Sequence, residues 1–241
     1  DNMLSMSAFW VGAGTAIASL CSYYGIPLSL SNVMVGLTAT LPVLQLAGSM
    51  LYARAAAPRR FVVAANLLWR MCLPLAFLSV ALPAAAGRPV FVVLYALGVL
   101  LYELANPVQN SWMALSVGRG APANYYALRE TCFMLTYTGA FCVANLFLAR
   151  GQATGAQRPA FLALGILLAV LLCGSDLVLL RLPAEMPAPR RKRLPGMIRG
   201  VWQNRAFRQV LLFNMAYSFC SMLVGSYSAL YQVQVLNISF V

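Results

Sequence analysis

The sequence predicts an all-α fold, a polytopic transmembrane helical bundle. Of the 241 residues, 61% are hydrophobic, against about 45 to 50% in an ordinary soluble domain, and only 9% are charged, against about 25%. A helical span needs about 20 apolar residues to cross the hydrocarbon layer. None of the apolar runs has the form of a removable signal peptide. Seven runs meet the length requirement, at residues 4–24, 32–53, 61–82, 90–113, 126–149, 159–182 and 208–231.

Basic residues predict how these spans are oriented. The loops after the second, fourth and sixth spans hold most of the Lys and Arg residues, whereas the alternate loops hold only Arg88, Arg150 and Arg158. Loops rich in Lys and Arg face the cytoplasm. We therefore expect the N-terminus to be cytoplasmic, and we expect lipid headgroups to contact many of the basic side chains.

Residues 183–207 form the longest polar stretch and predict the domain organisation. This stretch contains four prolines and the basic run Arg190–Arg193, which is typical of a linker. It separates a six-helix transmembrane half, residues 1–182, from the first span of a second half, residues 208–241. Six spans, a basic cytoplasmic linker and a new span are the layout of a transporter built from two six-helix halves. We expect the chain to be one such half plus the start of the other, with the remainder of the second half as its missing partner.

Two stretches of the chain resemble the major facilitator superfamily. One stretch is similar to the second span and following loop of that superfamily, and it comprises Ser29, Ser31, Val35, Gly36, Leu37, Gly48, Arg59 and Arg60. The other is similar to the end of span four and the start of span five in a poorly characterised bacterial branch. It comprises Asn106-Pro107, Asn110-Ser111-Trp112-Met113, Tyr125, Tyr126 and Arg129.

The resemblance implies a secondary transporter that moves a small-molecule substrate by alternating access in a bacterial inner membrane. It also implies an inner gate at the cytoplasmic ends of the spans. The loop signature of the superfamily contains an aspartate, but this loop reads Arg54-Ala55-Ala56-Ala57-Pro58-Arg59-Arg60, so the gating contact made by that acid does not carry over. The candidates for the inner gate or loop signature are Gly48, Arg54, Arg59, Arg60, Arg129 and Asp176.

Ionisable residues within spans are costly and therefore indicate function. Arg70 and Glu103 lie at matched depth in the third and fourth spans, which a short loop makes antiparallel neighbours. Pro74 and Pro107 each follow one of these residues by four positions and free the carbonyl of that residue from its helical hydrogen bond. Both sites are therefore expected to be polar and hydrated.

Two interpretations of Arg70 and Glu103 remain open. They could line a central cavity, with Glu103 taking up a proton or a cationic group and Arg70 holding an anion or tuning the pKa of the acid. They could equally form a structural ion pair, if their side chains face each other. For Asp176 we expect an ion pair with Arg129 or Arg181, and the alternative is a proton site. The further candidates for the substrate or proton pathway are Asn106, Asn110, Gln45, Asn66, Asn145, Asn214 and Tyr217.

Several function classes are excluded by composition. The chain has no histidine, its one lysine is Lys192, and its cysteines form no C-x-x-C pair, so we predict no catalytic site, no metal and no cofactor. The net charge of +12 comes from arginines between hydrophobic blocks, which does not predict nucleic-acid binding. The alternative to transport is a non-transporting sensor or scaffold that uses the same fold, and the absent loop aspartate favours it.

Overall fold

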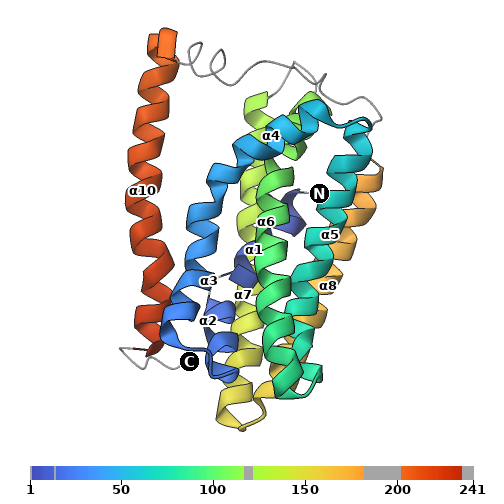
Figure 1. Ribbon diagram of the computed structural model, residues 1–241, viewed down its shortest axis with the longest axis vertical. Coiled ribbons are helices and arrows are strands. Elements are labelled where there is room, and N and C mark those ends of the chain that lie inside the picture. Colours follow the sequence, from blue (N-terminus) through green and yellow to red (C-terminus); the bar gives the residue numbers. More distant parts are fainter. Residues whose placement is uncertain (1, 14, 117–121, 182–201, 235–241) are drawn as a thin grey trace.

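The computed structural model describes residues 2–13, 15–116, 122–181 and 202–234, and the regular structure in these ranges is entirely helical. The helices run side by side and form an elongated bundle, with α10 standing at its edge (Figure 1). The helices are α1 (Asn2–Ala13), α2 (Thr15–Tyr23), α3 (Leu28–Thr40), η1 (Leu41–Val43), α4 (Leu44–Arg54), α5 (Pro58–Leu78), η2 (Ser79–Ala81), α6 (Ala84–Ser116), α7 (Pro122–Ala153), α8 (Gln157–Leu180) and α10 (Arg205–Gln234).

The helices confirm the predicted helical bundle, and most of them could span a membrane. Among the described residues, five helical segments are long and apolar enough to cross a membrane, and a sixth qualifies if the bent pair α1 and α2 is counted as one span. The five segments are Leu28–Arg54, Pro58–Ala81, Ala84–Met113, Asn124–Ala153 and Gln157–Leu180. They match the second to sixth predicted spans. The seventh predicted span lies within α10, which is helical, and its membrane crossing stays a prediction.

Two of the spans are interrupted. In the first, Met3–Ala13 and Ala16–Tyr23 meet at an angle of 41°. In the second, the 3-10 turn η1 separates α3 from α4. Pro42 lies at the start of this turn, and because proline has no N–H it cannot donate to the carbonyl four residues back. Proline therefore accounts for the break in the second span.

The contacts between spans follow a regular pattern. We number the spans in chain order, so that span 1 is α1 with α2, span 2 is α3 with α4, and spans 3 to 6 are α5, α6, α7 and α8. The main contacts form three sets of two pairs. Span 1 packs on span 5, as span 2 packs on span 4. Span 3 packs on span 4, as span 1 packs on span 6, and span 2 packs on span 3, as span 5 packs on span 6. Span 3 also packs on span 6. When the first three spans are exchanged with the last three, each of the first six pairs becomes another of them, and the pair of spans 3 and 6 becomes itself. The smaller contacts of span 1 with spans 2 and 3 have no counterpart of similar extent between span 4 and spans 5 and 6.

Aromatic side chains fill the centre of the bundle. The rings of Phe9 and Tyr102 are stacked with centroids 4.0 Å apart, and Trp69 lies edge-on to both. These three side chains join α1, α6 and α5. Such edge-on and stacked pairs each contribute about 0.5 to 1.5 kcal/mol beyond the area they bury. The aromatic cluster therefore holds the first, third and fourth spans together.

A second buried cluster lies where α4 ends and α5 begins. It joins α4, α5, α6 and α8 through Tyr52, Val62, Val108, Trp112 and Leu179. We call it the inner-end cluster, because the predicted orientation places it at the cytoplasmic end. It closes one end of the bundle around the fully buried indole of Trp112.

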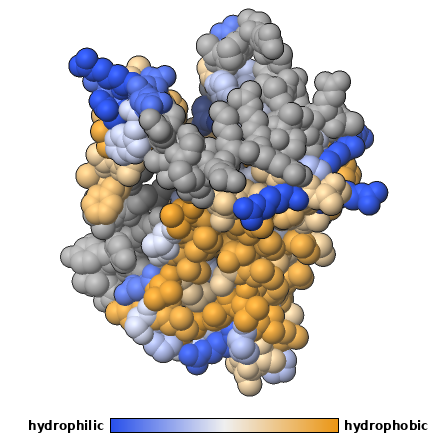
Figure 2. Space-filling model, turned by 45° about the horizontal axis from the view of Figure 1, so that its top comes forward, coloured by the Kyte–Doolittle hydropathy of each residue, from blue (hydrophilic) through white to orange (hydrophobic). Residues whose placement is uncertain are grey.

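The outer surface of the bundle is apolar. Large hydrophobic side chains such as Leu68, Met71, Val93, Leu135 and Ile166 are more than half exposed. Figure 2 shows the apolar surface as a broad region bordered by hydrophilic side chains. Monomeric soluble proteins rarely expose apolar patches of this extent. This surface is therefore suited to contact with lipid chains.

Gly48 marks the closest approach of α4 to α6. A Cβ atom at this position would overlap the backbone carbonyl of Leu104, which belongs to α6 and cannot rotate away. Small residues at helix contacts let backbones approach closely in membranes, where van der Waals packing drives association. The structure thus gives Gly48, a residue of the loop-signature resemblance, a packing role between spans 2 and 4.

Gly48→Ala is expected to destabilise the bundle by about 1 to 3 kcal/mol, because α4 and α6 must move apart to accept the methyl group. Gly36→Ala is the matched control, since a Cβ at Gly36 meets no atom within 4 Å. It is expected to be neutral or to stabilise α3 by about 0.5 to 1 kcal/mol. Chemical unfolding of the purified protein in detergent measures both effects. Equal stability of the two variants would contradict the close approach.

Candidate functional site

A buried ion pair links α5 to α8. Nη1 of Arg70 lies 2.8 Å from Oδ1 of Asp176, and the Arg70 side chain is fully buried while that of Asp176 is one-fifth exposed. The guanidinium carbon also lies 5.5 Å from the centroid of the Trp69 ring. Arg70 is therefore held by an opposite charge on one side and an aromatic ring on another.

Helix geometry explains why Arg70 and Asp176 meet. Leu78 of α5 packs directly on Gly165 of α8, and the two helices are antiparallel. Measured from this contact towards the predicted cytoplasmic end, Arg70 lies roughly 12 Å and Asp176 roughly 16 Å along its helix. Side chains in a helix lean towards its N-terminus. Arg70 therefore leans towards the level of Asp176, and Asp176 leans back towards Arg70.

A second buried polar contact links α4 to α6. Nε2 of Gln45 donates a hydrogen bond of 2.7 Å to Oε2 of Glu103, which is only 3% exposed. The contact lies one helical turn from Gly48, where the two helix backbones come closest. Gln45 and Glu103 therefore meet because Gly48 allows α4 to approach α6.

Arg70 and Glu103 are not partners, although both are buried at the centre of the bundle. Gly98 of α6 faces Cys72 and Trp69 of α5, and Glu103 lies roughly 140° around α6 from Gly98. Glu103 consequently points towards α4, and Arg70 points towards α8. Of the two open interpretations, the direct ion pair between Arg70 and Glu103 is wrong.

The expected partner of Asp176 was also wrong. Asp176 binds Arg70 rather than Arg129 or Arg181. Arg129 instead pairs with its neighbour Glu130, and its guanidinium lies 5.1 Å from the Tyr126 ring centroid. Sequence position placed Asp176 near the end of its span, where basic loop residues are numerous. Only the antiparallel packing of α5 on α8 brings the long side chain of Arg70 to it.

The other candidates of the fourth and third spans have local partners. Nδ2 of Asn110 donates to Oδ1 of Asn106 at 2.8 Å, and because they are four residues apart the two share one face of α6. Asn66 donates to the Val62 carbonyl and accepts from the indole N–H of Trp69. Asn66 is fully buried, so it orients Trp69 inside α5.

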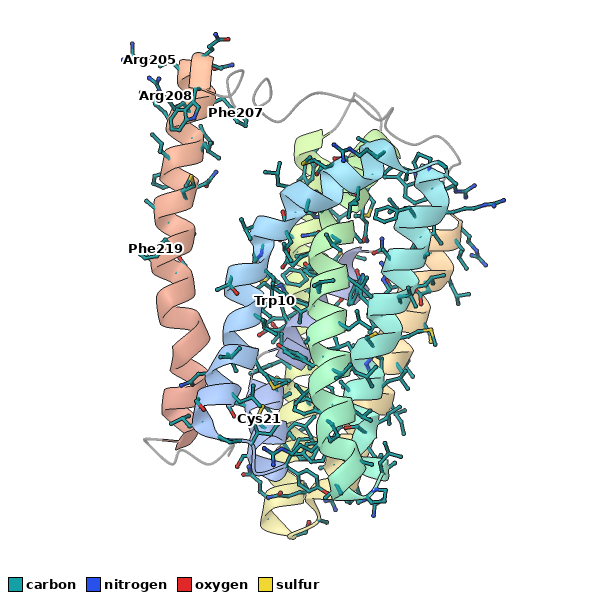
Figure 3. All side chains as sticks on the ribbon, viewed as in Figure 1. Trp10, Cys21, Arg205, Phe207, Arg208 and Phe219 are labelled. Carbon is teal, nitrogen blue, oxygen red and sulfur yellow. The ribbon has the colours of Figure 1, made fainter. Side chains whose placement is uncertain are left out.

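The remaining pathway candidates lie away from these contacts. Asn145 is half-buried on α7. Asn214 and Tyr217 are exposed on α10, where the Tyr217 ring stacks on Phe213. Figure 3 shows α10 beside the bundle, with Phe219 pointing away from it. In the part of the chain that the structure describes, α10 packs mainly on α2 and α3, near the far end of the bundle.

The basic candidates lie at the end of the bundle that holds the inner-end cluster. Arg54, Arg59 and Arg60 are exposed around the turn between α4 and α5. The Arg59 guanidinium carbon lies 6.0 Å from the ring centroid of Trp112. Arg59 thus covers the inner-end cluster.

Sequence reasoning missed a polar pocket of about 260 Å³ at the opposite end of the bundle. Its lining combines hydroxyl and amide groups with apolar side chains. No regular spacing marks these residues, which come together from α2, α7 and α8. The lining residues are Ser19, Ser22, Tyr23, Leu148, Gln152, Gln157, Ala160 and Phe161.

Within the described ranges, no group of three or more Cys, Asp and Glu side chains comes close enough to hold a metal ion. In the comparisons with known proteins, no family model, no curated protein and no solved structure matches this chain.

Asp176→Ala is expected to destabilise the protein by about 3 to 5 kcal/mol, because it leaves the buried guanidinium without its carboxylate. The double variant Arg70→Met/Asp176→Leu is expected to recover most of this loss, since it removes both charges. Glu130→Gln, which breaks the exposed pair with Arg129, should cost less than about 1 kcal/mol. Unfolding free energies in detergent test the set. If the unfolding free energy of the double variant is no higher than that of Asp176→Ala, the two charges are not coupled.

Proposed function

We propose that this chain is the first half of a secondary transporter of the major facilitator type, which moves a small solute by alternating access. The observation that carries the proposal is that the main contacts among the six spans form matching pairs when spans 1 to 3 are exchanged with spans 4 to 6. A unit of three spans ends on the opposite side of the membrane from its start, so its repeat is inverted. Inverted repeats are typical of secondary transporters, in which they form the two alternately exposed sides of the site.

Ionisable side chains inside the spans support the same proposal. A charged residue at the centre of a span costs about 2.5 to 3.5 kcal/mol on insertion scales, so its retention needs a reason. Arg70 and Asp176 compensate each other, and their pair forms one neutral unit. Glu103 has a neutral amide, that of Gln45, as its hydrogen-bond partner. Binding a proton at Glu103 therefore removes a buried charge that the amide cannot neutralise.

We therefore assign the proton-coupling role to Glu103 and a positioning role to Gln45. The amide of Gln45 can donate to the ionised acid, and after rotation its oxygen can accept from the protonated acid. Protonation would thus change a hydrogen bond between α4 and α6, which belong to different three-span units. The Asn106 and Asn110 pair continues from Glu103 along α6 as a polar path towards the predicted cytoplasmic end.

The proposal includes a second half and a membrane. The exposed apolar side chains of α10, among them Phe213 and Phe219, would pack against further spans of that half. We place the protein in a bacterial inner membrane with its N-terminus in the cytoplasm, on the basis of the basic loops and of the resemblance. The substrate would bind at the interface of the two halves.

A non-transporting sensor or scaffold is the second candidate function. The loop between α4 and α5 lacks the aspartate of the superfamily signature, and its arginines are exposed. An inner gate that depends on this acid would be missing. Binding of a solute to the full-length protein without any flux would support the sensor over the transporter.

Glu103→Gln is the test of the transport proposal. The full-length protein is reconstituted into vesicles and a panel of solutes is screened for uptake. In the variant, uptake driven by an imposed pH gradient should fall to background because the site no longer exchanges a proton. Exchange of solute across the membrane without a gradient should persist, since it needs no net proton movement.

Glu130→Gln is the matched control, because Glu130 is an exposed acid outside the buried contacts, and it should keep both activities. If Glu103→Gln loses uptake and exchange equally while remaining folded, the proton-coupling role fails. If the wild-type protein binds solutes but moves none of them, the transport proposal itself fails.

A further inference from the structure

Three arginines surround the turn between α4 and α5. Arg54 lies in the last turn of α4, and Arg59 and Arg60 lie in the first turn of α5. All three are exposed, and we call them the arginine turn. Figure 1 shows this turn at the same end of the molecule as the start of α10, where Figure 3 places Arg205 and Arg208.

In the part of the chain that the structure describes, no acidic side chain forms an ion pair with the arginine turn. The whole chain has 5 acidic residues against 17 basic ones. Glu103 binds Gln45, Asp176 binds Arg70, and Glu130 binds Arg129. The described carboxylates are thus occupied elsewhere, and the positive charge of the turn is left for an external anion.

Helix stability does not explain Arg59 and Arg60. The N-terminus of a helix carries a partial positive charge, so cations in the first turn are unfavourable by about 0.3 to 1 kcal/mol each. The residue before α5 is Ala57, which provides no side-chain cap, and the first turn of α5 contains no acid. The two arginines therefore add positive charge where the helix already has it.

The arginine turn lies where the apolar surface of the bundle ends. Leu51 of α4 and Leu68 of α5 are about half exposed, within a few helical turns of the arginines. Arg59 extends over the Trp112 ring at the edge of the inner-end cluster. Arg54 is the last residue of the membrane-spanning segment Leu28–Arg54, and Arg59 and Arg60 are the second and third residues of the segment Pro58–Ala81. This position brings the guanidinium groups to the depth of lipid phosphates.

We propose that Arg54, Arg59 and Arg60 bind the phosphate of an anionic phospholipid. Guanidinium groups donate paired hydrogen bonds to phosphate oxygens, and several arginines around one phosphate give both charge and geometry. A zwitterionic lipid carries its own ammonium group, which cancels the phosphate charge and weakens the attraction. The site is therefore selective for lipids with net negative charge. The proposal does not depend on transport, only on the apolar surface that places the protein in a bilayer.

The test measures binding of phosphatidylglycerol and of phosphatidylcholine to the full-length protein in detergent, by native mass spectrometry. Wild-type protein should bind phosphatidylglycerol more tightly. Each basic residue near an anionic surface contributes about 1 kcal/mol, so Arg59→Gln/Arg60→Gln should weaken phosphatidylglycerol binding about 30-fold. Phosphatidylcholine binding should change much less.

Arg88→Gln/Arg150→Gln is the matched control, because it removes the same charge from exposed arginines at the opposite end of the bundle. This variant should keep the wild-type preference. Arg59→Lys/Arg60→Lys should keep part of it, since lysine retains the charge without the paired donors. Equal losses in the two Gln variants, or no preference in the wild-type protein, would overturn the proposal. If Arg59→Gln/Arg60→Gln fails to fold, the Lys variant is measured at high salt instead. A preference for phosphatidylglycerol that stays unchanged there would also overturn the proposal.

Discussion

Within a lipid bilayer, a buried charged group has no water and must find its partner inside the protein. Arg70 is the most demanding group of this kind in the described structure, because its guanidinium is charged at any accessible pH. Its ion pair with Asp176 ties α5 to α8, and its contact with Trp69 connects the pair to the aromatic cluster that joins α1 and α6. The buried arginine is thus linked directly to α8 and, through Trp69, to α1 and α6.

Glu103 has a different environment from Arg70, and the difference suggests a division of roles. The Arg70 pair is neutral as a unit, so it can persist through conformational change and act as a fixed link between spans 3 and 6. Glu103 is held by the Gln45 amide between spans 2 and 4, and it can gain or lose a proton without breaking an ion pair. In the proposed transport function, the fixed pair and the exchangeable site would lie on separate helix contacts.

The exposed side chains of the bundle differ in polarity between the middle of the spans and their ends. Exposed Leu, Val and Met side chains cover the spans, where lipid chains provide an apolar solvent. Exposed arginines gather near the ends of the spans, and Arg59 of the arginine turn lies over Trp112 of the inner-end cluster. Van der Waals packing in the interior, at positions such as Gly48, then decides how closely neighbouring spans approach.

Composition and apolar run length determined the membrane-embedded helical bundle and placed spans 2 to 6 within a few residues, because hydropathy depends on local sequence alone. The same local reasoning singled out Arg70, Glu103 and Asp176 as candidate functional charges. Only the tertiary structure decided that Arg70 pairs with Asp176 and that Glu103 pairs with Gln45. Partner choice depends on the rotation of each helix about its axis and on which helices are neighbours, and those are fixed by packing at residues far apart in the chain, such as Leu78 with Gly165 and Gly48 with Leu104.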